Sequence, residues 1–112
     1  MNWNNLTDPA QLDALTQESE QQPVLIFKHS TTCSISATAK NRLERQWQAS
    51  ADQAKLYYLD LLSYRNVSNL VAEKFGIRHE SPQVLLIKNG KCVYHNSHLS
   101  INAPAIESQL SK

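Results

Sequence analysis

Two apolar runs near the end of the chain, residues 83–88 and 91–95, are separated only by the dipeptide Asn89-Gly90. Asn-Gly is typical of a two-residue type I′ turn, because both residues of that turn adopt positive φ angles. The pattern therefore predicts a β-hairpin in which the two runs pair antiparallel. Ser81-Pro82 directly precedes the first run, and a proline is tolerated at the first residue of a strand.

Two earlier strands, each followed by a helix, are predicted upstream of the hairpin. Residues 24–28 begin with four apolar side chains and are bounded by polar residues, as in a short buried strand. Residues 34–49 follow as a helix, because apolar side chains recur at every fourth position: Ile35, Ala39, Leu43 and Trp47. Residues 55–61 form the second strand, and the helical spacing after them ends at Gly76, which favours a helix C-cap.

Helices are also predicted at both ends of the chain. Asp8, Pro9 and Gln11 form a helix-start signature, which indicates a first helix over residues 9–19. Asn102 similarly begins a short final helix. The order is then βαβαββα after an extra leading helix, and the right-handed crossover rule makes the first two strands parallel. The expected fold is α/β and thioredoxin-like, with a four-stranded mixed sheet flanked by helices.

Length and composition fit one domain over residues 1–112. With 41% hydrophobic and 19% charged residues, the chain can bury a single core. The 11 basic and 10 acidic residues give a net charge of +1 without a block of like charge, which disfavours nucleic acid or an anionic membrane as a partner. The N-terminal residues lack the basic and apolar regions of a secretory signal, so we expect a cytoplasmic protein.

Cys33 lies directly after the first predicted strand and directly before a predicted helix. Unpaired N–H groups and the positive end of the helix dipole favour the thiolate at such a position, and the thiolate is the nucleophile. Ser36 stands where a dithiol redox protein has its second cysteine, so Cys33-Ser34-Ile35-Ser36 has the pattern of a monothiol site. The Ser36 hydroxyl either donates to the sulfur or caps the helix, and Thr32 is expected to shape the turn.

Ser81-Pro82 is expected beside Cys33, because the first and third predicted strands run antiparallel. A cis peptide bond is predicted there, since its tight turn would present the backbone of Ser81 to a sulfur that approaches Cys33. The ordinary alternative is a trans proline that begins a strand.

Cys92 is expected at the other end of the sheet, next to the Asn89-Gly90 turn. The two sulfurs would then lie roughly 10 Å or more apart, beyond the reach of a disulfide, so Cys92 is interpreted as a half-buried small hydrophobe. Four histidines lack the spacing of a structural zinc site: His29, His79, His95 and His98. We predict no metal; His29 or His95 could polarise the thiolate, and simple surface solvation is the alternative.

Two separated segments resemble the monothiol bacilliredoxin family, the bacillithiol-system redox-active proteins of thioredoxin-like fold. They are Lys-His-Ser-Thr-Thr-Cys-Ser-Ile-Ser at residues 28–36 and His-Glu-Ser-Pro-Gln at residues 79–83. Asn89-Gly90 and His98 match as well, so the resemblance spans nearly the whole chain. It implies that Cys33 is the redox cysteine and that Ser81-Pro82 is a cis-proline element for substrate docking. The family pattern has proline where this chain has Ser34.

The resemblance implies a thiol-disulfide oxidoreductase that reduces mixed disulfides between protein cysteines and a low-molecular-weight thiol. Cys33 would be the nucleophile, supported by Ser36, Ser34, Thr32 and His29. Bacillithiol would be the co-substrate, S-thiolated proteins would be the partners, and no metal, nucleotide or flavin cofactor would be needed.

Two alternatives belong to other classes. A monothiol glutaredoxin that binds an iron–sulfur cluster resembles a Cys-Gly-Phe-Ser site, whereas this chain has Cys33-Ser34-Ile35-Ser36. A non-catalytic thioredoxin-like interaction module would use Cys33 as a redox sensor that is modified by oxidants. Turnover of a mixed disulfide distinguishes an enzyme from such a module.

Overall fold

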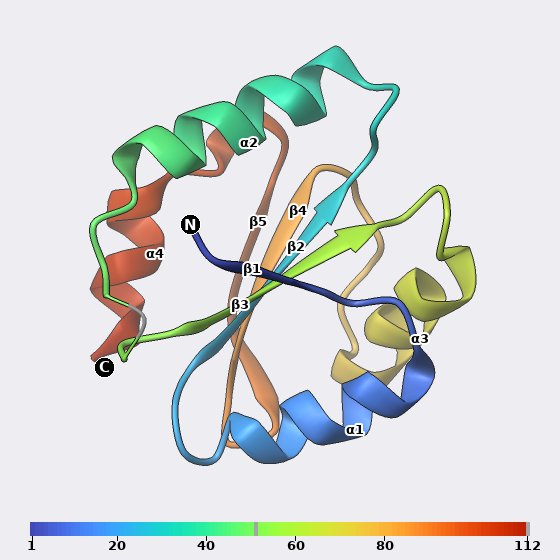
Figure 1. Cartoon of the computed structure of the whole chain (residues 1–112), viewed down its shortest axis with the longest axis vertical. Helices are drawn as coiled ribbons and strands as arrows, with labels where there is room; N and C mark the ends of the chain where they lie inside the picture. Colours follow the sequence, from blue (N-terminus) through green and yellow to red (C-terminus); the bar gives the residue numbers. More distant parts are fainter. Residues whose placement is uncertain (51, 112) are drawn as a thin grey trace.

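The computed structural model describes residues 1–50 and 52–111, which form a mixed sheet of five strands in the order β1-β3-β2-β4-β5 with helices on both faces (Figure 1). The strands are β1 (Trp3–Asn5), β2 (Val24–His29), β3 (Lys55–Asp60), β4 (Gln83–Lys88) and β5 (Lys91–Ser97). The helices are α1 (Pro9–Glu18), α2 (Ser34–Gln46), α3 (Arg65–Phe75), α4 (Ala103–Leu110) and the short 3₁₀ helix η1 (His98–Ser100). This is the predicted α/β class with the thioredoxin-like order of elements.

Strand β2 lies at the centre of the sheet and is buried along its whole length. It pairs parallel with β3 and antiparallel with β4, as the predicted topology requires. Alternate side chains of β2 point to opposite faces. Val24 and Ile26 pack in the cluster that includes side chains of α1 and α3, whereas Leu25 and Phe27 pack with α2 and α4. The sheet therefore separates two apolar cores.

The hairpin between β4 and β5 is confirmed. Asn89 has φ 52° and Gly90 has φ 76°, so both turn residues adopt the positive φ of a type I′ turn. The strands pair antiparallel, with an irregularity in the register between Leu86 and Ile87. The helix start at Asp8 is also confirmed, because its side chain and that of Gln11 form a capping box.

The predicted number of four strands is wrong, because Trp3–Asn5 adds β1 in parallel along the free edge of β3. Asparagine is depleted in strands, so the sequence Trp-Asn-Asn gave no strand signal. Tertiary contacts determine this pairing: the ring of Trp3 lies 5.8 Å from that of Phe27, and its indole N–H donates to Glu44 at 2.9 Å.

The predicted end of the second helix at residue 49 is also wrong, because α2 ends at Gln46 and Trp47 is extended, with φ −67° and ψ 125°. The regular spacing continued through Trp47, whose ring packs against the core beneath α2 and α4. Trp47 reaches that core from an extended backbone. The four-residue spacing of apolar side chains is the same whether Trp47 is extended or belongs to a last helical turn, so the spacing does not reveal where the helix ends. Within residues 1–50 and 52–111, no helix has the length and apolar character needed to cross a membrane.

Gly76 ends α3 in the left-handed region, with φ 66°, and a Cβ added there would meet no atom within 4 Å. Replacement by alanine therefore tests backbone strain without a steric clash. We expect Gly76→Ala to lower the free energy of unfolding by about 1 kcal/mol. Gly76→Asn should lower it less, because asparagine tolerates this region better. Urea denaturation measures both variants, and an alanine variant as stable as the parent would contradict the assignment.

Candidate active site

The end of β2 and the start of β4 lie side by side, at the border of the sheet where these central strands end and begin. We call this border the Cys33 edge. Lys28 pairs with Gln83 in the antiparallel register, so the loop after β2, which carries Cys33, and Ser81-Pro82 lie at this same edge (Figure 1). The Ser81–Pro82 peptide bond is cis. Pro82 is buried, and the hydroxyl oxygen of Ser81 is buried without a hydrogen-bond partner in the described part of the chain.

Cys33 is the N-cap residue of α2, with an extended backbone at φ −104° and ψ 121°. Its N–H donates to the carbonyl of Ser30 at 3.2 Å, which closes the turn between β2 and α2. Cys33 is half-buried, and its side chain makes no capping hydrogen bond. The first N–H groups of a helix have no partners within it, so the start of α2 can donate to a thiolate at this position. Thr32 and Ser34, on either side, are exposed.

Ser36 lies one turn into α2 and is fully buried. Its hydroxyl oxygen accepts the N–H of Ser30 at 3.1 Å and lies 2.7 Å from Nδ1 of His29. No hydrogen bond joins it to the sulfur of Cys33 within the described residues. The hydroxyl thus connects the turn before Cys33, the helix after it and the last residue of β2.

His29 is buried at the end of β2, on the face covered by α2. Its ring lies 5.9 Å from that of Phe27 and 5.6 Å from that of Tyr58. Burial lowers the pKa of His29; the charge of Lys40 acts in the same direction, whereas Asp60 and Glu44 oppose it. A neutral imidazole accepts through Nδ1 when its proton is on Nε2. With that tautomer the Ser36 hydroxyl donates to His29, and with the proton on Nδ1 it accepts.

Lys28, the residue before His29, is fully buried on the opposite face of the sheet. Its ammonium donates to the carbonyl of Ser68 in α3 at 3.3 Å and contacts Nδ1 of His79 at 3.2 Å. Burial lowers the pKa of Lys28 to about 8. The apolar pattern of residues 24–28 predicts a buried strand, but it does not predict a buried charge at Lys28. The signal available was a lysine within a strand expected to be enclosed on both faces.

The segment after β5 makes a backbone contact with Pro82. The N–H of His98 donates to the carbonyl of Pro82 at 2.9 Å. One guanidinium nitrogen of Arg42, from α2, donates to the carbonyls of Leu99 and Ile101 at 2.5 and 2.6 Å. The helix that begins at Cys33 is therefore connected to the proline turn through η1, an arrangement that sequence spacing does not reveal.

The structure does not bring Cys92 to this edge. It lies in β5 opposite Ile87, next to the hairpin turn, and its sulfur donates to the carbonyl of Tyr94 at 3.4 Å. Burial raises the pKa of this thiol, which favours its neutral form. Across residues 1–50 and 52–111, no group of three or more histidine, cysteine or acidic side chains is placed to hold a metal ion.

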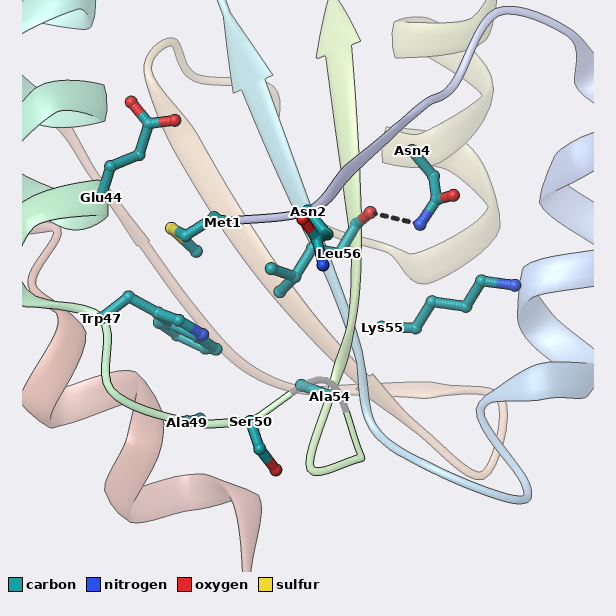
Figure 2. Close-up of a pocket in the computed structure, with 10 residues that line it drawn as sticks. All are labelled: Met1, Asn2, Asn4, Glu44, Trp47, Ala49, Ser50, Ala54, Lys55 and Leu56. Atoms are coloured by element: carbon teal, nitrogen blue, oxygen red, sulfur yellow. Dashed lines mark hydrogen bonds between the residues drawn. The ribbon is translucent and has the colours of Figure 1, made fainter.

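A cavity of about 370 Å³ lies at the far end of α2, away from Cys33 (Figure 2). Glu44 lines it from α2, Trp47 from the residue after α2, Lys55 and Leu56 from the start of β3, and Met1 from the N-terminal segment. Cys33 and Ser81-Pro82 are not among its lining residues. The candidate site at Cys33 lies instead where β2 gives way to α2, outside this cavity.

The two cysteines should differ in reactivity. Cys33 adjoins the N–H groups of a helix start, whereas burial holds Cys92 in its neutral form. We expect iodoacetamide at mildly acidic pH to alkylate Cys33 several-fold faster than Cys92. Peptide mapping over a time course measures both rates, with the unfolded protein as the control for intrinsic reactivity. Faster alkylation of Cys92 would exclude Cys33 as the activated thiol.

Lys28 should make stability depend on pH. Its pKa is about 8 in the folded chain and 10.5 ordinarily, so the unfolded chain binds more protons between these values and stability rises with pH there. Lys28→Met removes this contribution. The free energy of unfolding of the variant, relative to the parent, should therefore fall from pH 8 to pH 10.5, by at most ~1.4 kcal/mol per pH unit. Urea denaturation across this range measures it, and a constant difference would contradict the shifted pKa.

Comparison with known proteins agrees with this geometry. The family model described as monothiol bacilliredoxin BrxC matches residues 4–106. A solved structure described as having a thioredoxin fold is similar with a TM-score of 0.79 and 29% identity, over 96% of this chain and 92% of that chain. The thioredoxin of Malassezia sympodialis, Mala s 13, is similar with a TM-score of 0.73 and 17% identity, over 98% of this chain and 89% of that one.

Fasciola hepatica thioredoxin is similar with a TM-score of 0.68 and 17% identity, over 96% of both chains. At 17% identity these two thioredoxins show the fold alone. The family match covers most of the chain and includes both segments that meet at the Cys33 edge. The protein therefore belongs to the monothiol bacilliredoxin family, thiol redox proteins with the thioredoxin fold.

Proposed function

We propose that this protein is an enzyme that reduces mixed disulfides between protein cysteines and a low-molecular-weight thiol, with Cys33 as the nucleophile. The observation that carries the proposal is the N-cap position of Cys33 at the Cys33 edge of the sheet, with Ser36 in the place of a second cysteine. A single thiol at a helix start can be activated for exchange. It cannot complete the reduction by forming an internal disulfide with its neighbour.

The reaction is one thiol–disulfide exchange at a time. The Cys33 thiolate attacks the sulfur of the small thiol in the mixed disulfide, and a new disulfide forms between Cys33 and that thiol. The old sulfur–sulfur bond breaks, and the target protein leaves as a thiolate that takes a proton from water. A second thiolate then attacks the Cys33 adduct, so that Cys33 is released and a small-molecule or mixed disulfide carries away the oxidising equivalents.

The residues around Cys33 have separate proposed roles. The start of α2 stabilises the thiolate through its unpaired N–H groups. Ser36 and His29 hold the turn in place through their hydrogen bond, and the exposed Thr32 and Ser34 leave the sulfur accessible. Ser81-Pro82 docks the incoming disulfide through the backbone of Ser81.

Bacillithiol is the proposed co-substrate, and S-thiolated proteins in the cytoplasm are the proposed partners. Membership of the bacilliredoxin family supports both. The exchange transfers electrons directly between sulfur atoms, so the proposed reaction calls for no metal, nucleotide or flavin. It also calls for no contact with nucleic acid or a membrane.

Intact-mass analysis tests this function. The protein is incubated separately with bacillithiol disulfide and with glutathione disulfide. We expect one adduct of the small thiol on the parent and on Cys92→Ser, none on Cys33→Ser, and faster formation with bacillithiol disulfide. The adduct should then disappear when the free thiol is added, since turnover requires release. A stable adduct without turnover would support a sensor, and an adduct at Cys92 would exclude the proposed mechanism.

A further inference from the structure

Lys28 is a charged side chain with no exposed surface, and this requires an explanation beyond packing. Lysine is almost never fully buried unless it is paired, because removing an ammonium from water is costly. An apolar side chain such as methionine would fill similar space without this cost. Lys28 also lies in the strand that leads directly to Cys33, so its contacts bear on the geometry of the active edge.

The ammonium of Lys28 makes two polar contacts, and they reach two different elements. It donates to the carbonyl of Ser68 in α3 at 3.3 Å, and it lies 3.2 Å from Nδ1 of His79. The hydroxyl of Ser68 lies 3.4 Å from the same nitrogen. Because the ammonium is a donor without acceptor capacity, Nδ1 of His79 accepts, and His79 is then neutral.

The charges around this contact favour the neutral imidazole. Burial lowers the pKa of His79, and the cations of Lys28 and Arg65 lower it further, whereas Glu80 opposes them. Arg65 is the first residue of α3, and Glu80 follows His79 in the loop before β4. His79 as a whole residue is exposed, although the contact of its Nδ1 with Lys28 is partly buried. His79 is therefore held at Nδ1 by the contacts with Lys28 and Ser68.

His79 belongs to the segment that ends in the cis proline, and neighbouring elements hold this segment at several points. The side-chain amide of Gln83 donates to the carbonyl of Arg78 at 3.0 Å. The hydroxyl of Ser97, in β5, donates to Glu80 at 2.9 Å. Lys28 supplies the corresponding contact from β2, the strand that also carries the Cys33 loop.

We propose that Lys28 is a positioning residue for thiol exchange: by holding His79, it fixes the Ser81-Pro82 loop at the place where the disulfide docks beside Cys33. This inference rests on the proposed function and assigns part of its docking geometry to a buried cation. Lys28 touches no reacting atom, and its effect is transmitted through His79. Loss of the contact therefore slows docking-dependent exchange and leaves the intrinsic reactivity of Cys33 unchanged.

Two rate constants measured on each variant test the proposal. The first is the formation of the Cys33 adduct with bacillithiol disulfide, which requires docking. The second is alkylation of Cys33 by iodoacetamide, which requires the thiolate and no docking on the loop. The variants are Lys28→Met, His79→Leu, His79→Asn and the double variant Lys28→Met with His79→Leu. Lys91→Met, an exposed lysine in β5, is the control with the same change in charge.

Lys28→Met and His79→Leu should each lower the exchange rate constant about tenfold, which corresponds to ~1.4 kcal/mol, with alkylation unchanged. His79→Asn should stay within about threefold of the parent, because its amide oxygen offers an acceptor in place of Nδ1. The double variant removes the buried charge together with its acceptor. Exchange by the double variant should remain slow even if its free energy of unfolding returns to that of the parent. If Lys28 acted only through stability, the exchange rate would recover together with the stability.

Different outcomes would contradict the positioning role of Lys28 and the proposed function. Parent-like exchange in Lys28→Met, with an active parent enzyme, overturns the positioning role and leaves the proposed function intact. Equal losses of exchange and alkylation overturn it as well, because the effect would then lie in the reactivity of Cys33. A parent that forms no adduct with bacillithiol disulfide, while Cys33 is alkylated normally, overturns the proposed function and the inference with it.

Discussion

The enclosure of β2 is the constraint on which the rest of the structure depends. All six of its residues are buried, and it pairs with β3 on one side and with β4 on the other. A shift of one residue in its register would move every side chain to the opposite face of the sheet. The two apolar cores therefore fix the register. The same register places the end of β2 beside the start of β4, which brings Cys33 and Ser81-Pro82 to one edge.

The last two residues of β2 point to opposite faces of the sheet, and each contacts a different part of the site. His29 points to the face covered by α2, where its Nδ1 shares a hydrogen bond with the hydroxyl of Ser36. Lys28 points to the face covered by α3, where its ammonium holds His79. One residue is thus connected to the helix that begins at Cys33, and the other to the loop that leads to Pro82. Polar side chains buried at these positions replace apolar packing with directional contacts.

The sequence was sufficient for the elements whose signals are local. The Asn89-Gly90 turn and the capping box at Asp8 depend on residues a few positions apart, and both form as predicted. β1 could not be predicted, because Trp3–Asn5 becomes a strand only when the edge of β3 and the ring of Phe27 are already in place. Sequence spacing likewise placed Cys33 before a helix and opposite Ser81-Pro82.

The partners of the buried polar groups in the site could not be predicted in the same way. Ser36 and His29 are seven positions apart, and Lys28 and His79 are 51 apart. No periodicity links such pairs, because each forms across packed elements whose approach is set by the apolar cores. A lysine within a buried strand signals that a partner must exist, but only the fold identifies it.

Ser36 does more than occupy the position of a missing second cysteine, because its hydroxyl makes hydrogen bonds of its own. Its hydroxyl is fully buried and engaged by His29 and by the N–H of Ser30, so the position has a structural use of its own. Cys33, by contrast, is half-buried and flanked by the exposed Thr32 and Ser34. In the proposed reaction the adduct on Cys33 cannot be resolved from within the helix. A thiol from solution must then resolve it, so the supply of that thiol would limit the rate at which Cys33 is regenerated.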